Sequence, residues 1–141
     1  MERVVIDTNV YIDWFNKGRH EAVLFRREAV KYLSAVVLME LLAGAFSAVD
    51  RSLVRKVASA FAKVDRIVVP TVKVYEEAGE VLRQLQASHG YTVPSAYGLV
   101  NDVLIALSAR SIGAVVITQN ERDFAAIRAI RPFKFSSLAS H

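Results

Sequence analysis

The stretch Arg3-Val4-Val5-Ile6-Asp7-Thr8-Asn9 decides how the fold of this chain is interpreted. Its three β-branched residues predict a short buried strand at residues 4–6. Asp7 follows where that strand ends, and burying an unpaired carboxylate there costs several kcal/mol. A hydrogen bond, a counter-charge or a metal ion must offset this cost. Because ligands bind at the carboxyl ends of the strands in open parallel sheets, Asp7 is a candidate for chemistry.

Strand-like segments alternate with helix-like segments along the chain. Strands are expected at residues 4–6, 32–33, 67–69 and 114–118, with an edge strand at 133–135. Helices are expected at residues 10–15, 21–30, 36–46, 72–88 and 99–112. Asp50 is expected to cap one further helix, and a short helix after Asp123 is expected to end at Ile130. Ser34 and Thr71 are expected helix N-caps, and loops are expected at residues 91–98 and 119–123. This alternation predicts an α/β sandwich with a mainly parallel sheet, in a single domain over residues 1–141.

Composition and charge narrow the functional classes. The 141 residues include no cysteine, which excludes disulfides and thiolate metal sites and fits a cytoplasmic protein. The histidines, His20, His89 and His141, are scattered, so a His-based site is not expected. No apolar run approaches the ~20 residues of a bilayer span, and no signal peptide is expected. The net charge of +4 attracts polyanions such as nucleic acid, or serves solubility.

Four of the 14 acidic residues lie where burial is expected. They are Asp7 after the first strand, Glu40 in the apolar segment 36–44, Asp102 in the apolar segment 99–107, and Asp123 after the strand 114–118. Each also has an ordinary explanation. Asp7 and Asp123 are possible helix caps, Asp102 is a possible partner of its own helix dipole, and Glu40 is a possible ion-pair partner. The other acids share helices with basic residues, and solvated faces explain them.

Chain topology brings several of these polar groups to one edge of the predicted sheet. Asp7 and Thr118 each end a strand, and Asp102 begins the helix that leads into the second of those strands. Carboxylates that converge there repel one another. A hard divalent cation removes the conflict, and carboxylate and water oxygens suit Mg²⁺ or Mn²⁺. Such an ion polarises a phosphodiester, lowers the pKa of a bound water and stabilises the leaving oxygen.

Four segments together resemble the PIN-domain ribonucleases, and most closely the VapC-type toxins of toxin–antitoxin pairs. These segments are Val5-Ile6-Asp7-Thr8-Asn9, Ser34…Glu40-Leu41…Gly44, Asn101-Asp102…Ile105-Ala106 and Ile117-Thr118-Gln119-Asn120-Glu121-Arg122-Asp123-Phe124. Their order and spacing cover nearly the whole chain. The resemblance implies a PIN-like three-layer α/β/α sandwich with a mainly parallel central sheet. It also implies a Mg²⁺- or Mn²⁺-dependent endoribonuclease, the toxin of such a pair.

The resemblance also implies roles for individual residues and partners. Asp7, Glu40, Asp102 and Asp123 would be catalytic, and all of these except Glu40 would bind metal. Many relatives carry aspartate where this chain has Asn120, which becomes a weaker neutral ligand or a substrate contact. Thr118, Asn120 and Asn9 would bind substrate. The resemblance further implies a homodimer, and an antitoxin whose tail covers the acidic site.

Basic and aromatic side chains have two interpretations each. The basic residues Arg51, Arg55, Lys56, Lys63, Arg122 and Arg128 either contact RNA phosphates or form solvated faces. Tyr11, Trp14 and Tyr97 either stack bases or pack in the core or a dimer interface.

Two other functions compete with the ribonuclease. One is an RNA- or partner-binding module with weak or no catalysis. The other is a phosphohydrolase of the haloacid-dehalogenase type, which would place a second aspartate where this chain has Asn9.

Overall fold

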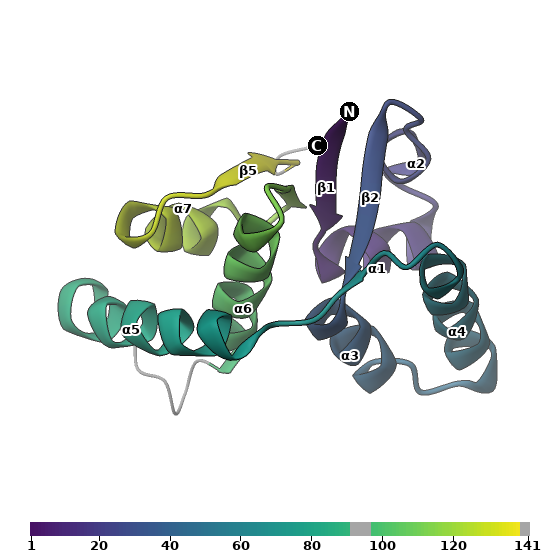
Figure 1. Cartoon of the computed structure of the whole chain (residues 1–141). Helices are drawn as coiled ribbons and strands as arrows, with labels where there is room; N and C mark the ends of the chain where they lie inside the picture. Colours follow the sequence, from purple (N-terminus) through teal and green to yellow (C-terminus); the bar gives the residue numbers. More distant parts are fainter. Residues whose placement is uncertain (91–96, 139–141) are drawn as a thin grey trace.

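A five-stranded parallel sheet organises the chain (Figure 1). The computed structural model describes residues 1–90 and 97–138. The strands are β1 (Glu2–Ile6), β2 (Ala29–Ser34), β3 (Ile67–Val68), β4 (Val115–Thr118) and β5 (Lys134–Ser137). Their order is β3-β2-β1-β4-β5, and every pairing is parallel. The predicted parallel sheet and the predicted edge strand near residue 135 are therefore confirmed.

Helices in two groups flank this sheet and complete the α/β/α sandwich. The helices are α1 (Thr8–Lys17), α2 (Glu21–Leu24), α3 (Ala35–Ala43), α4 (Ala48–Lys63), α5 (Val72–His89), α6 (Tyr97–Ser111) and α7 (Glu121–Ile130). Helices α5, α6 and α7 contact one another, while α3 contacts both α1 and α4. Figure 1 shows the first group beside β5 and the second beside β2.

The core lies where the two central strands meet the helices. Val5, Ile6 and Val116 are almost fully buried, as expected for strands that are covered on both faces. Phe124 of α7 is also buried, and its ring lies 6.1 Å from the rings of both Phe133 and Phe135. Within the described residues, no helix is both long enough and apolar enough to cross a bilayer.

The helix predicted over residues 21–30 is wrong in its second half. Helix α2 ends at Leu24, and the chain enters β2 at Ala29. In β2, Ala29 and Val30 pair with Glu2 and Arg3 of β1. Backbone pairing with a distant strand, together with burial, overrides the local helical preference of this segment.

Two helix starts also differ from the predictions, while two predicted caps are confirmed. Ser34 and Thr71 cap α3 and α5 as expected. The predicted cap Asp50 is wrong, because the Ser47 hydroxyl accepts a hydrogen bond from the Asp50 backbone N–H at 3.0 Å. The loop predicted at 119–123 is shorter, because Asn120 caps α7. Of the loop predicted at 91–98, residues 91–96 lie outside the described part of the chain.

Ion pairs around Glu77 join the helices of the first group, and we predict that they contribute to stability. Glu77 lies 2.7 Å from Arg131 and 3.8 Å from Arg110, with 17% of its side chain exposed. Glu77→Gln removes the charge while keeping the shape, so the free energy of unfolding should fall by about 1–2 kcal/mol. Urea unfolding measures this change. Glu76→Gln, at an exposed neighbour, is the control; equal losses in both variants would contradict the prediction.

Candidate active site

The candidate site lies where the strand order reverses direction. From β1 the chain passes to β2 and then β3, which lie on one side of β1 within the sheet. It later enters β4, which lies on the other side of β1. The Asp7 backbone N–H donates to the Ile117 carbonyl at 2.8 Å, so the ends of β1 and β4 lie together. Such a reversal point opens a crevice beyond the carboxyl ends of the strands.

Asp7 is buried where these strand ends meet, with 3% of its surface exposed. One carboxylate oxygen caps α1 by accepting from the Thr8 N–H at 2.8 Å. The other accepts from the Thr118 hydroxyl at 2.7 Å and from the Asn9 amide at 3.3 Å. Asp7 is therefore a helix cap, and it also lies among the polar groups at the strand ends. Burial raises the pKa of its carboxyl despite these hydrogen bonds.

Glu40 of α3 also lies close to the end of β1, where its carboxylate contacts Thr8 at the start of α1. One of its carboxylate oxygens accepts from the Thr8 hydroxyl at 2.6 Å, and the other accepts from the Asn101 amide at 3.2 Å. These two donors fix Glu40 between α1 and α6. Sequence reasoning gave no role to Thr8 or Asn101. Their positions directly after Asp7 and directly before Asp102 were the available signal.

Asp102 and Asp123 are joined through the side chain of Asn120. The Asn120 amide nitrogen donates to Asp102 at 3.0 Å and to Asp123 at 3.1 Å. The amide oxygen accepts from the Asp123 backbone N–H at 3.4 Å and so caps α7. The alternative that Asp123 caps this helix is wrong, because Asp123 is the residue whose backbone N–H is capped.

Electrostatic repulsion acts most strongly on Asp102. Burial is the main reason why the pKa of Asp102 rises to about 8. The charges of Asp7, Glu40 and Asp123 raise it further. The structure thus brings Asp7, Glu40 and Asp123 within electrostatic reach of Asp102. Thr118 and Asn9 donate to Asp7, and Asn120 donates to Asp102 and Asp123.

The donor chemistry of this cluster fits a hard divalent cation. Among the described residues, no three His, Asp or Glu side chains form a group that could hold one ion as they stand, and the amide of Asn120 lies between Asp102 and Asp123. The buried groups are nevertheless oxygen donors of the kind that Mg²⁺ and Mn²⁺ select. Burial raises the pKa of both Asp7 and Asp102, and a cation would reverse that shift.

A second polar cluster, which the sequence did not reveal, adjoins the site through Gln119. The Gln119 backbone N–H donates to the Asn9 side chain at 3.2 Å. Its side-chain amide donates to Asp13 at 2.7 Å and lies 2.7 Å from His20 Nε2. The hydrogen bond from Gln119 is the main reason why the pKa of Asp13 is lowered. These contacts hold the loop after β4 against α1, and they join residues about a hundred positions apart.

Of the three predicted aromatic residues, the structure describes the side-chain surroundings of two, Tyr11 and Trp14. Tyr11 is buried in the core, which contradicts a stacking role. Trp14 packs against Phe15 and Phe25 at centroid distances of 5.3 and 5.4 Å, and the side chain of Tyr97 lies outside the described part.

The six basic residues named above are exposed: Arg51, Arg55, Lys56, Lys63, Arg122 and Arg128. Of these, Arg51 donates to the Phe46 carbonyl at 3.1 Å.

Comparison with known proteins gives one family and a set of similar folds. The PIN domain family model matches residues 4–130. A chain of a DNA-bound VapBC structure from Salmonella typhimurium is 23% identical, with a TM-score of 0.70 and coverage of 97% of this chain and 98% of that one. A FitAcB chain from Neisseria gonorrhoeae is 20% identical, with a TM-score of 0.67 and coverage of 94% and 95%. A chain of a toxin–antitoxin complex from Klebsiella pneumoniae is 25% identical, with a TM-score of 0.61 and coverage of 93% and 98%. Among curated proteins, none matches the chain in sequence.

The raised pKa of Asp102 predicts an unusual pH dependence of stability without metal. Between pH 3.8 and about 8, the folded state holds a proton on Asp102 that the unfolded state has lost. The free energy of unfolding should therefore fall as pH rises through this window. Asp102→Asn removes the carboxyl group that must hold this proton, so the variant should be more stable than wild type at pH ~8 by roughly 2 kcal/mol or more.

Urea unfolding in EDTA across this pH range measures the effect. Asp65→Asn, at an exposed acid, serves as the control. Parallel pH profiles for wild type and Asp102→Asn would contradict the prediction.

Proposed function

Since the chain belongs to the PIN domain family, we propose that it is a Mg²⁺- or Mn²⁺-dependent endoribonuclease and the toxin of a toxin–antitoxin pair. The convergence of Asp7, Glu40 and Asp123 on Asp102, at the reversal point of a parallel sheet, is the observation that carries the proposal. Solved structures with the same fold include chains of VapBC and FitAcB. A chain of a toxin–antitoxin complex from Klebsiella pneumoniae also has this fold, which supports the toxin assignment.

Each acid has a proposed part in phosphodiester hydrolysis. Asp7, Asp102 and Asp123 would hold the cation, which polarises the phosphodiester and lowers the pKa of a bound water. Glu40 is fixed by two donors, Thr8 and Asn101, and so presents its remaining lone pairs in a defined direction. In that position it can accept a hydrogen bond from the attacking water.

Neutral polar groups beside the acids are suited to orient the substrate. The Thr118 hydroxyl at the end of β4 and the Asn9 amide in the first turn of α1 both donate to Asp7. Asn120 offers both an amide donor and an amide oxygen next to Asp102. The net charge of +4 and the exposed arginine and lysine side chains supply the long-range attraction for a polyanion.

A homodimer is proposed as the working assembly. Val69, Val72 and Tyr75, where β3 leads into α5, expose 65%, 77% and 56% of their surfaces. Large apolar side chains exposed close together in sequence are typical of a surface that a second subunit covers.

An antitoxin is the second proposed partner, and an apolar groove of about 200 Å³ suits it. The groove lies between α1, α2 and α4, and it is lined by Tyr11, Trp14, Leu24, Phe25, Lys31, Val57, Ala60 and Phe61. Phe25 is 59% exposed there, which an apolar segment of another protein would cover. We propose that the antitoxin binds in this groove and extends its tail over the acidic crevice.

Two other functions make different predictions. A module that only binds RNA or a partner would bind no divalent ion, which calorimetric titration with millimolar Mn²⁺ would reveal. A phosphohydrolase of the haloacid-dehalogenase type would form an aspartyl-phosphate at Asp7. Its expected second aspartate is replaced by Asn9, which disfavours that function.

The main prediction concerns Asp7. Asp7→Asn keeps an oxygen that can cap α1 but removes the charge that the cation requires, so RNA cleavage should fall at least 100-fold, on the order of losing one central catalytic group. Gel assays with Mg²⁺ or Mn²⁺ measure cleavage, and EDTA should abolish it. The variant should keep the wild-type circular dichroism spectrum. Full activity of Asp7→Asn with metal present would overturn the assignment.

A further prediction concerns the groove between α1, α2 and α4. Phe25→Glu places a charge where the antitoxin would bury an apolar side chain, so the product of an adjacent small gene should bind at least tenfold more weakly. Titration calorimetry measures this affinity. Phe46→Glu is the control, because Phe46 is 88% exposed and does not line the groove. Equal affinity of the Phe25→Glu variant and wild type would exclude the groove as the binding site.

A further inference from the structure

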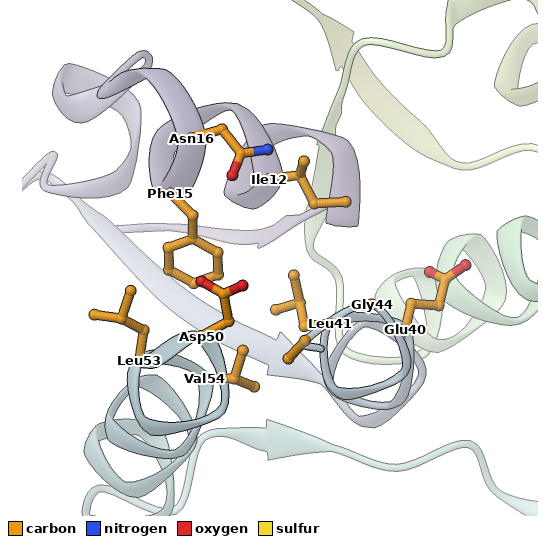
Figure 2. A pocket seen from close by; sticks show the side chains of 10 residues that line it. Ile12, Phe15, Asn16, Glu40, Leu41, Gly44, Asp50, Leu53 and Val54 are labelled. Atoms are coloured by element: carbon orange, nitrogen blue, oxygen red, sulfur yellow. The ribbon is translucent and has the colours of Figure 1, made fainter. Parts of the chain in front are cut away.

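A smaller cavity opens directly beside Glu40, on another face of α1 from the groove described above. Its volume is about 120 Å³. Figure 2 shows it between α1 and the corner that joins α3 to α4. Its lining residues are Ile12, Phe15, Asn16, Glu40, Leu41, Gly44, Ala45, Asp50, Leu53 and Val54. None of them lines the larger groove, so the two hollows are separate features.

The size and lining of the cavity suit one flat ring. An apolar cavity of about 150 Å³ is known to accept benzene, and this cavity is of similar size. Phe15 contributes an aromatic ring to one wall, and Leu41 and Val54 contribute branched aliphatic groups to the others (Figure 2). Ile12 is 43% exposed and Leu53 is 38% exposed at the mouth, so a ring that enters would cover apolar surface.

Polar groups at the mouth match the edge of a nucleobase. Asn16 on α1 and Asp50 on α4 both line the cavity (Figure 2). An asparagine side chain offers a donor and an acceptor, and a carboxylate accepts. Cytosine carries an amino group that an aspartate can accept from. An aliphatic side chain in the cavity would leave both polar groups without a partner from the ligand.

Glu40 connects the cavity with the acidic crevice. Its stem lines the cavity, while its carboxylate turns away from it (Figure 2) and accepts from Thr8 and Asn101. A base in the cavity and a phosphodiester in the crevice would therefore lie on opposite sides of one side chain. Neighbouring groups of a single RNA strand can span such a short separation. Proteins read single-stranded RNA by holding unstacked bases against aromatic rings.

We propose that this cavity binds one unstacked pyrimidine base of the RNA, next to the phosphodiester that is cleaved. The inference rests on the proposed ribonuclease function and adds a base preference to it. Phe15 supplies the ring surface, and Asp50 favours cytosine over uracil. Room for one ring in the cavity disfavours purines.

Gly44 provides a direct test because it lines the cavity without structural need for glycine. Its φ is −93°, which any residue adopts, and an added Cβ would lie 3.7 Å from the Glu40 carbonyl, an ordinary contact. Gly44→Leu should fill the cavity. Gly79→Leu is the matched control, because Gly79 is an exposed residue of α5 with open space around its Cβ position. Gly44→Ala gives a smaller change if Gly44→Leu does not fold.

Cleavage of a random-sequence RNA pool in Mn²⁺, followed by sequencing of the product ends, measures base preference. Wild type and Gly79→Leu should select a pyrimidine about tenfold over a purine at one position beside the cut, the worth of one stacking contact. Gly44→Leu should lose this selection at that position while still cleaving. Asp50→Asn should lower the ratio of cytosine to uracil. Unchanged selection in Gly44→Leu, or no selection in wild type, would overturn the proposal.

A crosslinking arm separates this proposal from the ribonuclease proposal. Asp7→Asn protein is irradiated with an RNA oligonucleotide that carries a single 4-thiouridine, and the crosslinked peptide is identified by mass spectrometry. The expected crosslink lies at Phe15 or Leu53 and is absent when Gly44→Leu is added. Crosslinking there without any wild-type cleavage would overturn the nuclease and support the base site. Cleavage with crosslinks only elsewhere would overturn the base site and leave the nuclease standing. Neither cleavage nor crosslinking at the cavity would overturn both.

Discussion

The buried carboxylate of Asp7 is the constraint on which the rest of the structure depends. Its backbone N–H extends the pairing of β1 with β4, one of its oxygens begins α1, and the other receives the Thr118 hydroxyl. A single residue thus fixes where a strand ends, where a helix starts and how far two strands are offset. An apolar residue at this position would leave the first N–H of α1 and the Thr118 hydroxyl without an acceptor inside the protein.

Hydrogen bonds and neighbouring charges act differently on the carboxyl groups of Asp7 and Asp102. Asp7 is held by three donors, Thr8, Thr118 and Asn9, which favour its charged form although burial opposes it. Burial, followed by the charges of three other acids, raises the pKa of Asp102 to about 8, although the Asn120 amide opposes this rise. Asp102 therefore carries a proton near neutral pH in the absence of a cation. Stability given up in this way is typical of a functional site.

Features fixed by local chemistry could be predicted from the sequence, and those fixed by distant contacts could not. The apolar runs of β1 and β4 and the caps Ser34 and Thr71 act within a few residues, and these predictions hold. The segment from Ala29 was misassigned because β1, rather than its own neighbours, makes it a strand. The acids were found because topology alone brings strand ends together. The donors to Glu40 and the contact of Gln119 with Asp13 depend on side-chain packing across the sheet, which no local pattern encodes.

Helix α1 connects the separate surfaces that the proposed activity needs. Because an α-helix has 3.6 residues per turn, α1 directs different side chains to three sides. Tyr11 and Trp14 line the larger apolar groove, Ile12 and Phe15 line the cavity beside Glu40, and Asn9 and Asp13 contact Gln119. The helix begins at Asp7, so its position is tied to the acidic crevice. A segment bound in the groove and a base bound in the cavity would press on different sides of this one helix. The proposed substrate and the proposed partner would therefore influence one another through a helix that starts at Asp7, even where their contacts do not overlap.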